Sequence, residues 1–172
     1  IILSLVFWNY LIYKNIKLSS KKINNFLPLG FVFLLYAQLI IGAFVSGMNA
    51  GNIYNTWPLM GNNYFPDDNL LINLFKFSSL NDPSLVQFIH RNLAYLIMLF
   101  YLFMFFKIYQ KNISDYFKIL YIIGILLVLQ ILLGIFTLLS GAQMYIASMH
   151  QISSIFLISS SVYFLYLNTK AS

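Results

Sequence analysis

The sequence predicts an all-α integral membrane protein, a four-helix transmembrane bundle built from two repeated hairpins and preceded by part of another helix. Of its 172 residues, 60% are hydrophobic and only 8% are charged, and the mean hydropathy is +0.80. Soluble globular domains do not have this composition. Four apolar segments each approach the ~20 residues that cross a hydrocarbon core of ~30 Å. Two of these segments share a motif, Gln-Leu-Ile-Ile-Gly at 38–42 and Gln-Ile-Leu-Leu-Gly at 130–134, which indicates an internal repeat.

The predicted elements follow the apolar segments in order. A partial span covers residues 1–13, and the full spans cover about 27–48, 85–106, 117–140 and 144–167. The chain opens with Ile inside an apolar run and lacks the basic start of a signal peptide, so we expect a fragment that begins part-way through a helix. Residues 1–26 are therefore interpreted as the end of a preceding transmembrane helix and a loop, and residues 27–172 as the four-helix unit.

The lysines predict the orientation. If the spans alternate in direction, one side of the membrane receives eight of them: Lys14, Lys17, Lys21, Lys22, Lys107, Lys111, Lys118 and Lys170. Positively charged loops stay on the cytoplasmic side, or the matrix side in mitochondria. We therefore expect a multi-pass protein of a bacterial or mitochondrial inner membrane. The net charge of +6 then reflects topology, and nucleic acid is not an expected partner, because the lysines flank apolar spans and form no polar basic face.

The long loop at about 49–84 faces the opposite side and contains several Gly and Pro turn signals. Residues 69–77 predict a short amphipathic helix, which either lies on the outer membrane interface or is buried over the mouth of the bundle. Four aromatic residues of the loop either roof the interior of the bundle or anchor the loop in the interface: Tyr54, Trp57, Tyr64 and Phe65. Residues 140–143 predict a tight turn.

The only two histidines occupy equivalent positions in the repeat. His90 and His150 each lie about six residues into the span that follows a Gln-x-x-x-Gly motif, 52 residues after Gln38 and 20 residues after Gln130. Both therefore lie roughly 9 Å below the outer helix ends. A single intramembrane histidine is most often a hydrogen-bonded helix contact. Two at matched depth favour a pair of ligands facing each other.

The donor set favours haem as the cofactor. Neutral imidazole binds iron, and a bis-histidine haem needs two imidazoles on opposite faces of a flat macrocycle. The chain has no cysteine and no glutamate, and its four aspartates lie outside the spans, so a zinc or dinuclear site lacks donors. His90 and His150 are the predicted iron ligands.

Two further features surround the histidines. Gly42 and Gly134 lie level with them, which indicates either room for a macrocycle or close packing of helices. Arg91 follows His90 directly. A charge at that depth needs a partner, and the alternatives are a haem propionate or snorkelling to a lipid phosphate.

Several motifs in order resemble the haem A synthase family. Residues 42–51 and 54–60 resemble the signature after that family's fifth helix, and residues 86–95 are similar to its next His-Arg helix. Residues 129–139, followed by Met-His-Gln at 149–151, resemble its final hairpin. The resemblance covers the chain from about residue 27 and is closest to the proteobacterial and mitochondrial branch.

The resemblance implies a function. The family has eight spans in two homologous halves, and it oxidises a methyl group of haem O to a formyl group, giving haem A for cytochrome oxidase. Residues 27–172 resemble the C-terminal, haem b-binding half, with His90 and His150 matching the haem ligands. The substrate pocket belongs to the N-terminal half, so no catalytic residue is assigned in this fragment. The expected partners are the N-terminal half, haem O, an electron-transfer partner that the sequence does not identify, membrane lipid, and haem O synthase or other assembly factors.

Two other functions stay open on the residues alone. One is a stand-alone bis-histidine b-type cytochrome that transfers electrons in the membrane. The other is a transporter or assembly bundle in which both histidines are structural, and this alternative predicts no haem.

Overall fold

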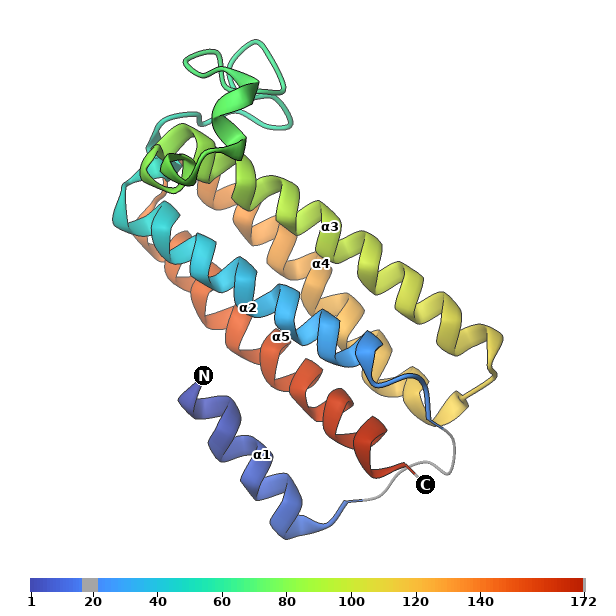
Figure 1. Cartoon of the computed structure of the whole chain (residues 1–172). Coiled ribbons are helices and arrows are strands. Elements are labelled where there is room, and N and C mark those ends of the chain that lie inside the picture. The colour runs from blue at the N-terminus through green and yellow to red at the C-terminus, as the bar shows by residue number, and fades with distance from the viewer. Residues whose placement is uncertain (17–21, 172) are drawn as a thin grey trace. The chain divides into compact units, whose positions relative to one another are not determined.

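The computed structural model describes residues 1–16 and 22–171, and all its long elements are helices (Figure 1). The helices are α1 (Ile2–Lys14), α2 (Phe26–Gly47), α3 (Pro83–Gln110), α4 (Phe117–Leu139) and α5 (Met144–Lys170). The short 3₁₀ helices are η1 (Ala50–Asn52), η2 (Leu71–Phe75), η3 (Phe77–Asn81) and η4 (Ser114–Tyr116). No strand occurs in this part of the chain, although one isolated bridge pairs Met60 with Asn63.

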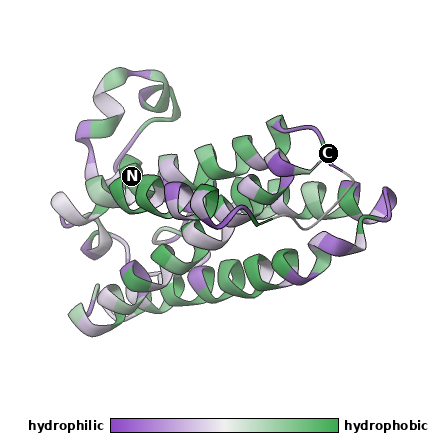
Figure 2. Cartoon of the chain, turned by 90° about the horizontal axis from the view of Figure 1, so that it is seen from below, coloured by the Kyte–Doolittle hydropathy of each residue, from purple (hydrophilic) through white to green (hydrophobic). Residues whose placement is uncertain are grey.

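The structure confirms the predicted fold class. Within the described residues, α2, α3, α4 and α5 are long and apolar enough to cross a membrane, and α1 is a shorter apolar helix. Apolar residues cover most of each long helix, and polar residues gather in the loops and at helix ends (Figure 2). The chain is thus that of a multi-pass membrane protein. Lys17 and Lys21, used above to predict the orientation, lie outside the described residues.

Two of the helices extend beyond the predicted spans, α3 to 83–110 and α5 to 144–170. The N-terminus of α3 is set by Asp82, whose Oδ1 accepts a hydrogen bond of 3.0 Å from the backbone N–H of Leu85. Pro83 follows as the first helical residue, where its missing N–H costs nothing. At their C-termini both helices continue into polar residues, because helical hydrogen bonding does not require apolar side chains.

The prediction of a single amphipathic helix at 69–77 is wrong, because the structure has short 3₁₀ helices there. The segment contains the 3₁₀ helix η2 and only the first residue of η3, which continues to Asn81, and the extended residue Lys76 caps both. No side chain of η2 is buried, and Phe75 and Phe77 are 83% and 90% exposed. The alternative of a buried helix is therefore also wrong.

The chain divides into two compact units, and each long helix contributes to both. Unit 1 comprises residues 1–35, 97–129 and 152–172. Its core is aromatic: Phe31 contacts Phe100 and Tyr101, and Tyr116 meets Phe164 edge-on. The buried side chain of Asn168 accepts a hydrogen bond from Ile23 N–H and donates to Ile23 C=O, at 2.9 and 3.1 Å.

Unit 2 comprises residues 36–96 and 130–151. It contains the last part of α2, the loop with η1 to η3, the first part of α3, the end of α4 and the start of α5. The turn between α4 and α5 is tight, as predicted, and Gly141 and Ala142 adopt the left-handed region at φ of 66° and 54°. All the predicted site residues lie in this unit.

Candidate functional site

The first hairpin places a glutamine of α2 against the histidine of α3. The side-chain N–H of Gln38 donates to the backbone carbonyl of His90 at 3.0 Å. The same Nε2 atom lies 3.2 Å from Nε2 of the His90 ring. One amide group thus binds both the backbone and the ring of His90.

The second hairpin repeats this arrangement. Nε2 of Gln130 on α4 donates to the backbone carbonyl of His150 on α5 at 2.9 Å. It also lies 3.1 Å from Nδ1 and 3.5 Å from Nε2 of the His150 ring. The internal repeat inferred from sequence is therefore present as a repeated three-dimensional contact.

The two predicted glycines lie against the histidine rings. A Cβ atom added to Gly42 would be 3.1 Å from Cε1 of His90, and one added to Gly134 would be 3.1 Å from Cε1 of His150. Such a contact is tighter than ordinary packing, so each glycine gives its imidazole room to approach the neighbouring helix. The structure places both glycines against the histidine rings, and the group that they accommodate here is the imidazole itself.

The two imidazoles offer nitrogen donors within one unit. Nδ1 of His90 is buried and has no hydrogen-bond partner. In the described part of the chain, no three His, Cys, Asp or Glu side chains gather as a metal site. The donor set therefore fits a cofactor that needs two axial nitrogens and supplies its other ligands itself, as haem does.

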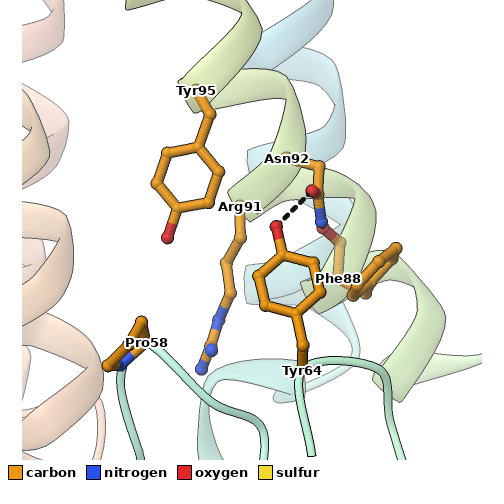
Figure 3. A pocket seen from close by; sticks show the side chains of 6 residues that line it. All are labelled: Pro58, Tyr64, Phe88, Arg91, Asn92 and Tyr95. Atoms are coloured by element: carbon orange, nitrogen blue, oxygen red, sulfur yellow. Dashed lines mark hydrogen bonds between the residues drawn. The ribbon is translucent and has the colours of Figure 1, made fainter.

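Arg91 binds the loop between α2 and α3. Its Nη2 donates to the carbonyls of Thr56 and Tyr54 at 2.8 and 3.3 Å, and its Nη1 donates to the carbonyl of Leu59 at 3.2 Å. Nε of Arg91 is buried without a partner. Figure 3 shows the guanidinium among side chains of α3 and the loop. Neither alternative from the sequence included these carbonyls, because no sequence pattern marks a backbone acceptor in a distant loop.

The aromatic residues of the loop pack on the N-terminal half of α3. Tyr64 donates to Oδ1 of Asn92 at 2.6 Å (Figure 3), and Trp57 donates to the hydroxyl of Tyr95 at 3.0 Å. Phe65 meets Phe88 edge-on, with ring centroids 5.0 Å apart. These three aromatic residues thus hold the loop against the helix that carries His90.

The carboxylate of Asp68 connects the loop to the start of α3 by hydrogen bonds. Asp68 accepts hydrogen bonds from Ser84 at 2.6 Å and from Tyr54 at 3.1 Å. Partial burial by itself raises the pKa of Asp68, but these hydrogen bonds outweigh it and hold the pKa below the usual 3.8. Partial burial and the hydrogen bond to Asp68 raise the pKa of Tyr54 above 10.0, so this phenol stays protonated and donates at neutral pH.

Sequence reasoning assigned no role to Gln38, Gln130 or Gln87. The first two belong to the repeated Gln-x-x-x-Gly motif, so a signal existed. Gln87 carried no signal. It is 3% exposed and donates to the carbonyl of Tyr54 at 3.0 Å, next to Arg91.

Comparison with known proteins identifies the family. The family COX15-CtaA, described as cytochrome oxidase assembly protein, matches residues 1–162. The chain belongs to this family. A protein of Pelagibacter ubique (strain HTCC1062) named "Heme A synthase" is 39% identical over 169 residues, which are 98% of this chain and 50% of that protein. A Rickettsia felis protein of the same name is 35% identical over 92% of this chain and 50% of its own length.

A third relative with this name, from Wolbachia pipientis wMel, is 40% identical over 81% of this chain and 38% of its own length. The chain therefore spans about half the length of the curated relatives it matches. No solved structure matches it. The family resemblance noted in the sequence is confirmed.

Proposed function

We propose that the chain is the C-terminal half of a haem A synthase and binds haem b between His90 and His150. The observation that carries this proposal is the repeated contact of glutamine, glycine and histidine, which brings two equivalent imidazoles into one unit. The names of the relatives support the enzyme class.

In this proposal each residue has a limited role. His90 and His150 would hold the iron of the haem. Gly42 and Gly134 let the rings reach their places against α2 and α4. Arg91 keeps the loop on α3 through its terminal nitrogens, and its buried Nε, which has no partner, would donate to a haem propionate. A haem held in this way accepts and donates single electrons.

The reaction belongs to the whole protein. We propose that it oxidises a methyl group of haem O to a formyl group for cytochrome oxidase, as an oxidoreductase of an inner membrane. The substrate site and the catalytic residues then lie in an N-terminal half, and no residue of this chain is assigned a catalytic role. An electron-transfer partner, haem O synthase and other assembly factors are the partners of the whole protein.

An optical experiment on the whole, purified protein tests the haem site. The reduced-minus-oxidised spectrum is recorded for the unsubstituted protein, for the double variant His90→Ala, His150→Ala, and for Gln110→Leu, a control at the exposed end of α3. We expect a low-spin b-type signal that is lost only in the histidine variant. If a folded histidine variant keeps the full signal, the haem is elsewhere and the proposal is wrong.

The same spectra, combined with a redox titration, test the role of Arg91. We expect Arg91→Ala to retain the haem and to raise its midpoint potential or lower it, because a charge beside a propionate changes the relative stability of ferric and ferrous iron. A potential equal to that of the unsubstituted protein would remove the propionate assignment and leave the loop carbonyls as the partners of Arg91.

A further inference from the structure

The glutamine amides are the polar groups nearest the histidine rings on α2 and α4. Gln38 and Gly42 are four residues apart, as are Gln130 and Gly134, so each pair lies on one face of its helix. The glycine contacts Cε1 of the imidazole, and the amide contacts a nitrogen next to it. Both helices thus place a glycine and an amide against the edge of the ring that carries its nitrogens, with the amide nearest Nε2 in His90 and nearest Nδ1 in His150.

This contact depends on where the proton of His90 lies. A neutral imidazole has one N–H donor and one lone pair, while an amide nitrogen only donates. The 3.2 Å contact between Nε2 of Gln38 and Nε2 of His90 is therefore a hydrogen bond in the tautomer whose proton is on Nδ1. Nδ1 is buried without an acceptor. In this tautomer the amide N–H of Gln38 is hydrogen-bonded to the lone pair of Nε2, and a metal would need that lone pair.

Binding of a metal changes the partner that the imidazole needs from a donor to an acceptor. A histidine that binds a metal through one nitrogen donates the N–H of its other nitrogen to an acceptor. The amide of Gln38 carries such an acceptor, since its Oε1 is buried and has no partner. Rotation of the amide about its last side-chain bond exchanges the positions of oxygen and nitrogen. One glutamine is thus able to donate to the metal-free imidazole and to accept from the metal-bound imidazole.

We infer that Gln38 and Gln130 are positioning residues that set the tautomer and orientation of His90 and His150. The amide nitrogen holds each ring before a cofactor binds, and the amide oxygen accepts the ring N–H once the other nitrogen binds iron. The inference rests on the proposed haem site. It names residues that the repeat places beside both ligands.

If Gln38 and Gln130 only packed the helices together, their substitution would affect stability but not the midpoint potential of the haem. The bonds from Gln38 and Gln130 to the histidine carbonyls also tie α2 to α3 and α4 to α5, so any substitution lowers stability. Only a tautomer-setting role changes the electron density on iron. An imidazole whose N–H is accepted by an oxygen is a stronger donor and favours ferric iron, which lowers the midpoint potential.

The experiment is an anaerobic redox titration of the whole, purified protein, followed by its optical spectrum. The variants are Gln38→Leu, Gln130→Leu, Gln38→Glu and Gln130→Glu, with Gln110→Leu as the control. Leucine has no acceptor, so we expect a higher midpoint potential and about 10- to 100-fold weaker haem retention. Glutamate offers only oxygens, so we expect it to retain the haem at a lower midpoint potential. The control should match the unsubstituted protein.

The outcomes separate this inference from the proposed function. If the unsubstituted protein has a histidine-dependent haem but the Leu and Glu variants shift its potential in the same direction, or not at all, the glutamines only pack helices and the inference is wrong. If the unsubstituted protein has no such haem, the proposed function fails and the inference fails with it. Should the Leu variants not fold, the glutamate variants, which match glutamine in size, decide by the sign of their shift.

Discussion

His90 and His150 have the same neighbours although they lie in different hairpins. Each ring has a glycine at Cε1, and each backbone carbonyl accepts from a glutamine. Such a match between two pairs of helices is more than packing requires, because many apolar residues fill the contact between two helices equally well. The match therefore indicates that the position of the imidazole itself is what both hairpins maintain.

The contacts of Gly42 and Gly134 with the histidine rings lead to a prediction for single residues. Gly42→Ala or Gly134→Ala places a methyl group 3.1 Å from Cε1 of the neighbouring histidine, so the ring must move by a few tenths of an ångström. Overpacking of this kind costs about 1–3 kcal/mol. We expect either variant of the whole protein to have a weaker low-spin haem signal in its optical spectrum.

Gly47→Ala is the matched control, because an added Cβ there meets nothing within 4 Å. It changes the same residue type in the same helix as Gly42→Ala. If the two α2 variants give equal spectra, the contact between Gly42 and His90 has no role in ligation.

Among the helices, α3 organises the site through its N-terminal half. Gln87 and Arg91 lie one helical turn apart, and both donate to the carbonyl of Tyr54. Phe88, Asn92 and Tyr95 contact the aromatic residues of the loop. The loop is long and has few helical residues, yet its backbone carbonyls and aromatic side chains are fixed on one helix. The α3 helix therefore couples the position of the loop to that of His90.

Asp68 makes the loop sensitive to acid. Its pKa is lower in the folded protein than the usual 3.8. Its stabilising contribution is therefore present above 3.8 and is lost as the pH falls through the lower, folded value. Asp68 is exposed, so solvent screening limits the effect to about 1 kcal/mol or less. We expect the loop to loosen below about pH 4.

Fluorescence of Trp57 measures this change, since its indole is held by Tyr95. Trp8 is the only other tryptophan, and Trp8→Phe removes its signal. Asp68→Asn is the control, because the amide oxygen still accepts hydrogen bonds but does not titrate. An acid transition of the same size in both proteins would assign it to other groups.

At the scale of the whole molecule, unit 1 and unit 2 differ in what holds them together. In α2, α4 and α5 every buried residue belongs to the stretches assigned to unit 1. Unit 1 also has buried hydrogen bonds, such as the one that the Tyr166 hydroxyl donates to the carbonyl of Leu11 at 2.7 Å. In unit 2, the same three helices contribute side chains that are only partly buried, including both glutamines and His150. Apolar packing thus dominates the core of unit 1, whereas unit 2 combines buried apolar residues such as Leu85 and Val86 with polar contacts to the histidines.

The orientation in the membrane is a prediction for the complete chain. The lysine-rich loops should face the cytoplasm or matrix. Because the 172 residues contain no cysteine, single cysteines report sidedness in a whole protein whose other cysteines are replaced by serine. We expect an impermeant maleimide to label Asn62→Cys in sealed, right-side-out membranes, and Lys111→Cys only after permeabilisation. The reverse pattern would contradict the orientation.

The helical spans, the tight turn at 140–143, the repeated hairpin and the family were all predictable from the amino-acid sequence. These features are local: hydropathy along a segment decides whether it crosses a membrane, and a motif is visible wherever it occurs. The sequence was wrong about 69–77, because the same apolar pattern is compatible with an α-helix and with two 3₁₀ helices.

The partners of the polar side chains at the site became visible only in the folded structure. The guanidinium of Arg91 binds carbonyls 32 to 37 residues earlier in the chain, and Gln38 binds a carbonyl 52 residues later. Every residue has a backbone carbonyl, so composition and spacing cannot distinguish the one that a side chain will bind. That choice depends on which backbone atoms the folded helices and the loop bring within about 3 Å of each donor.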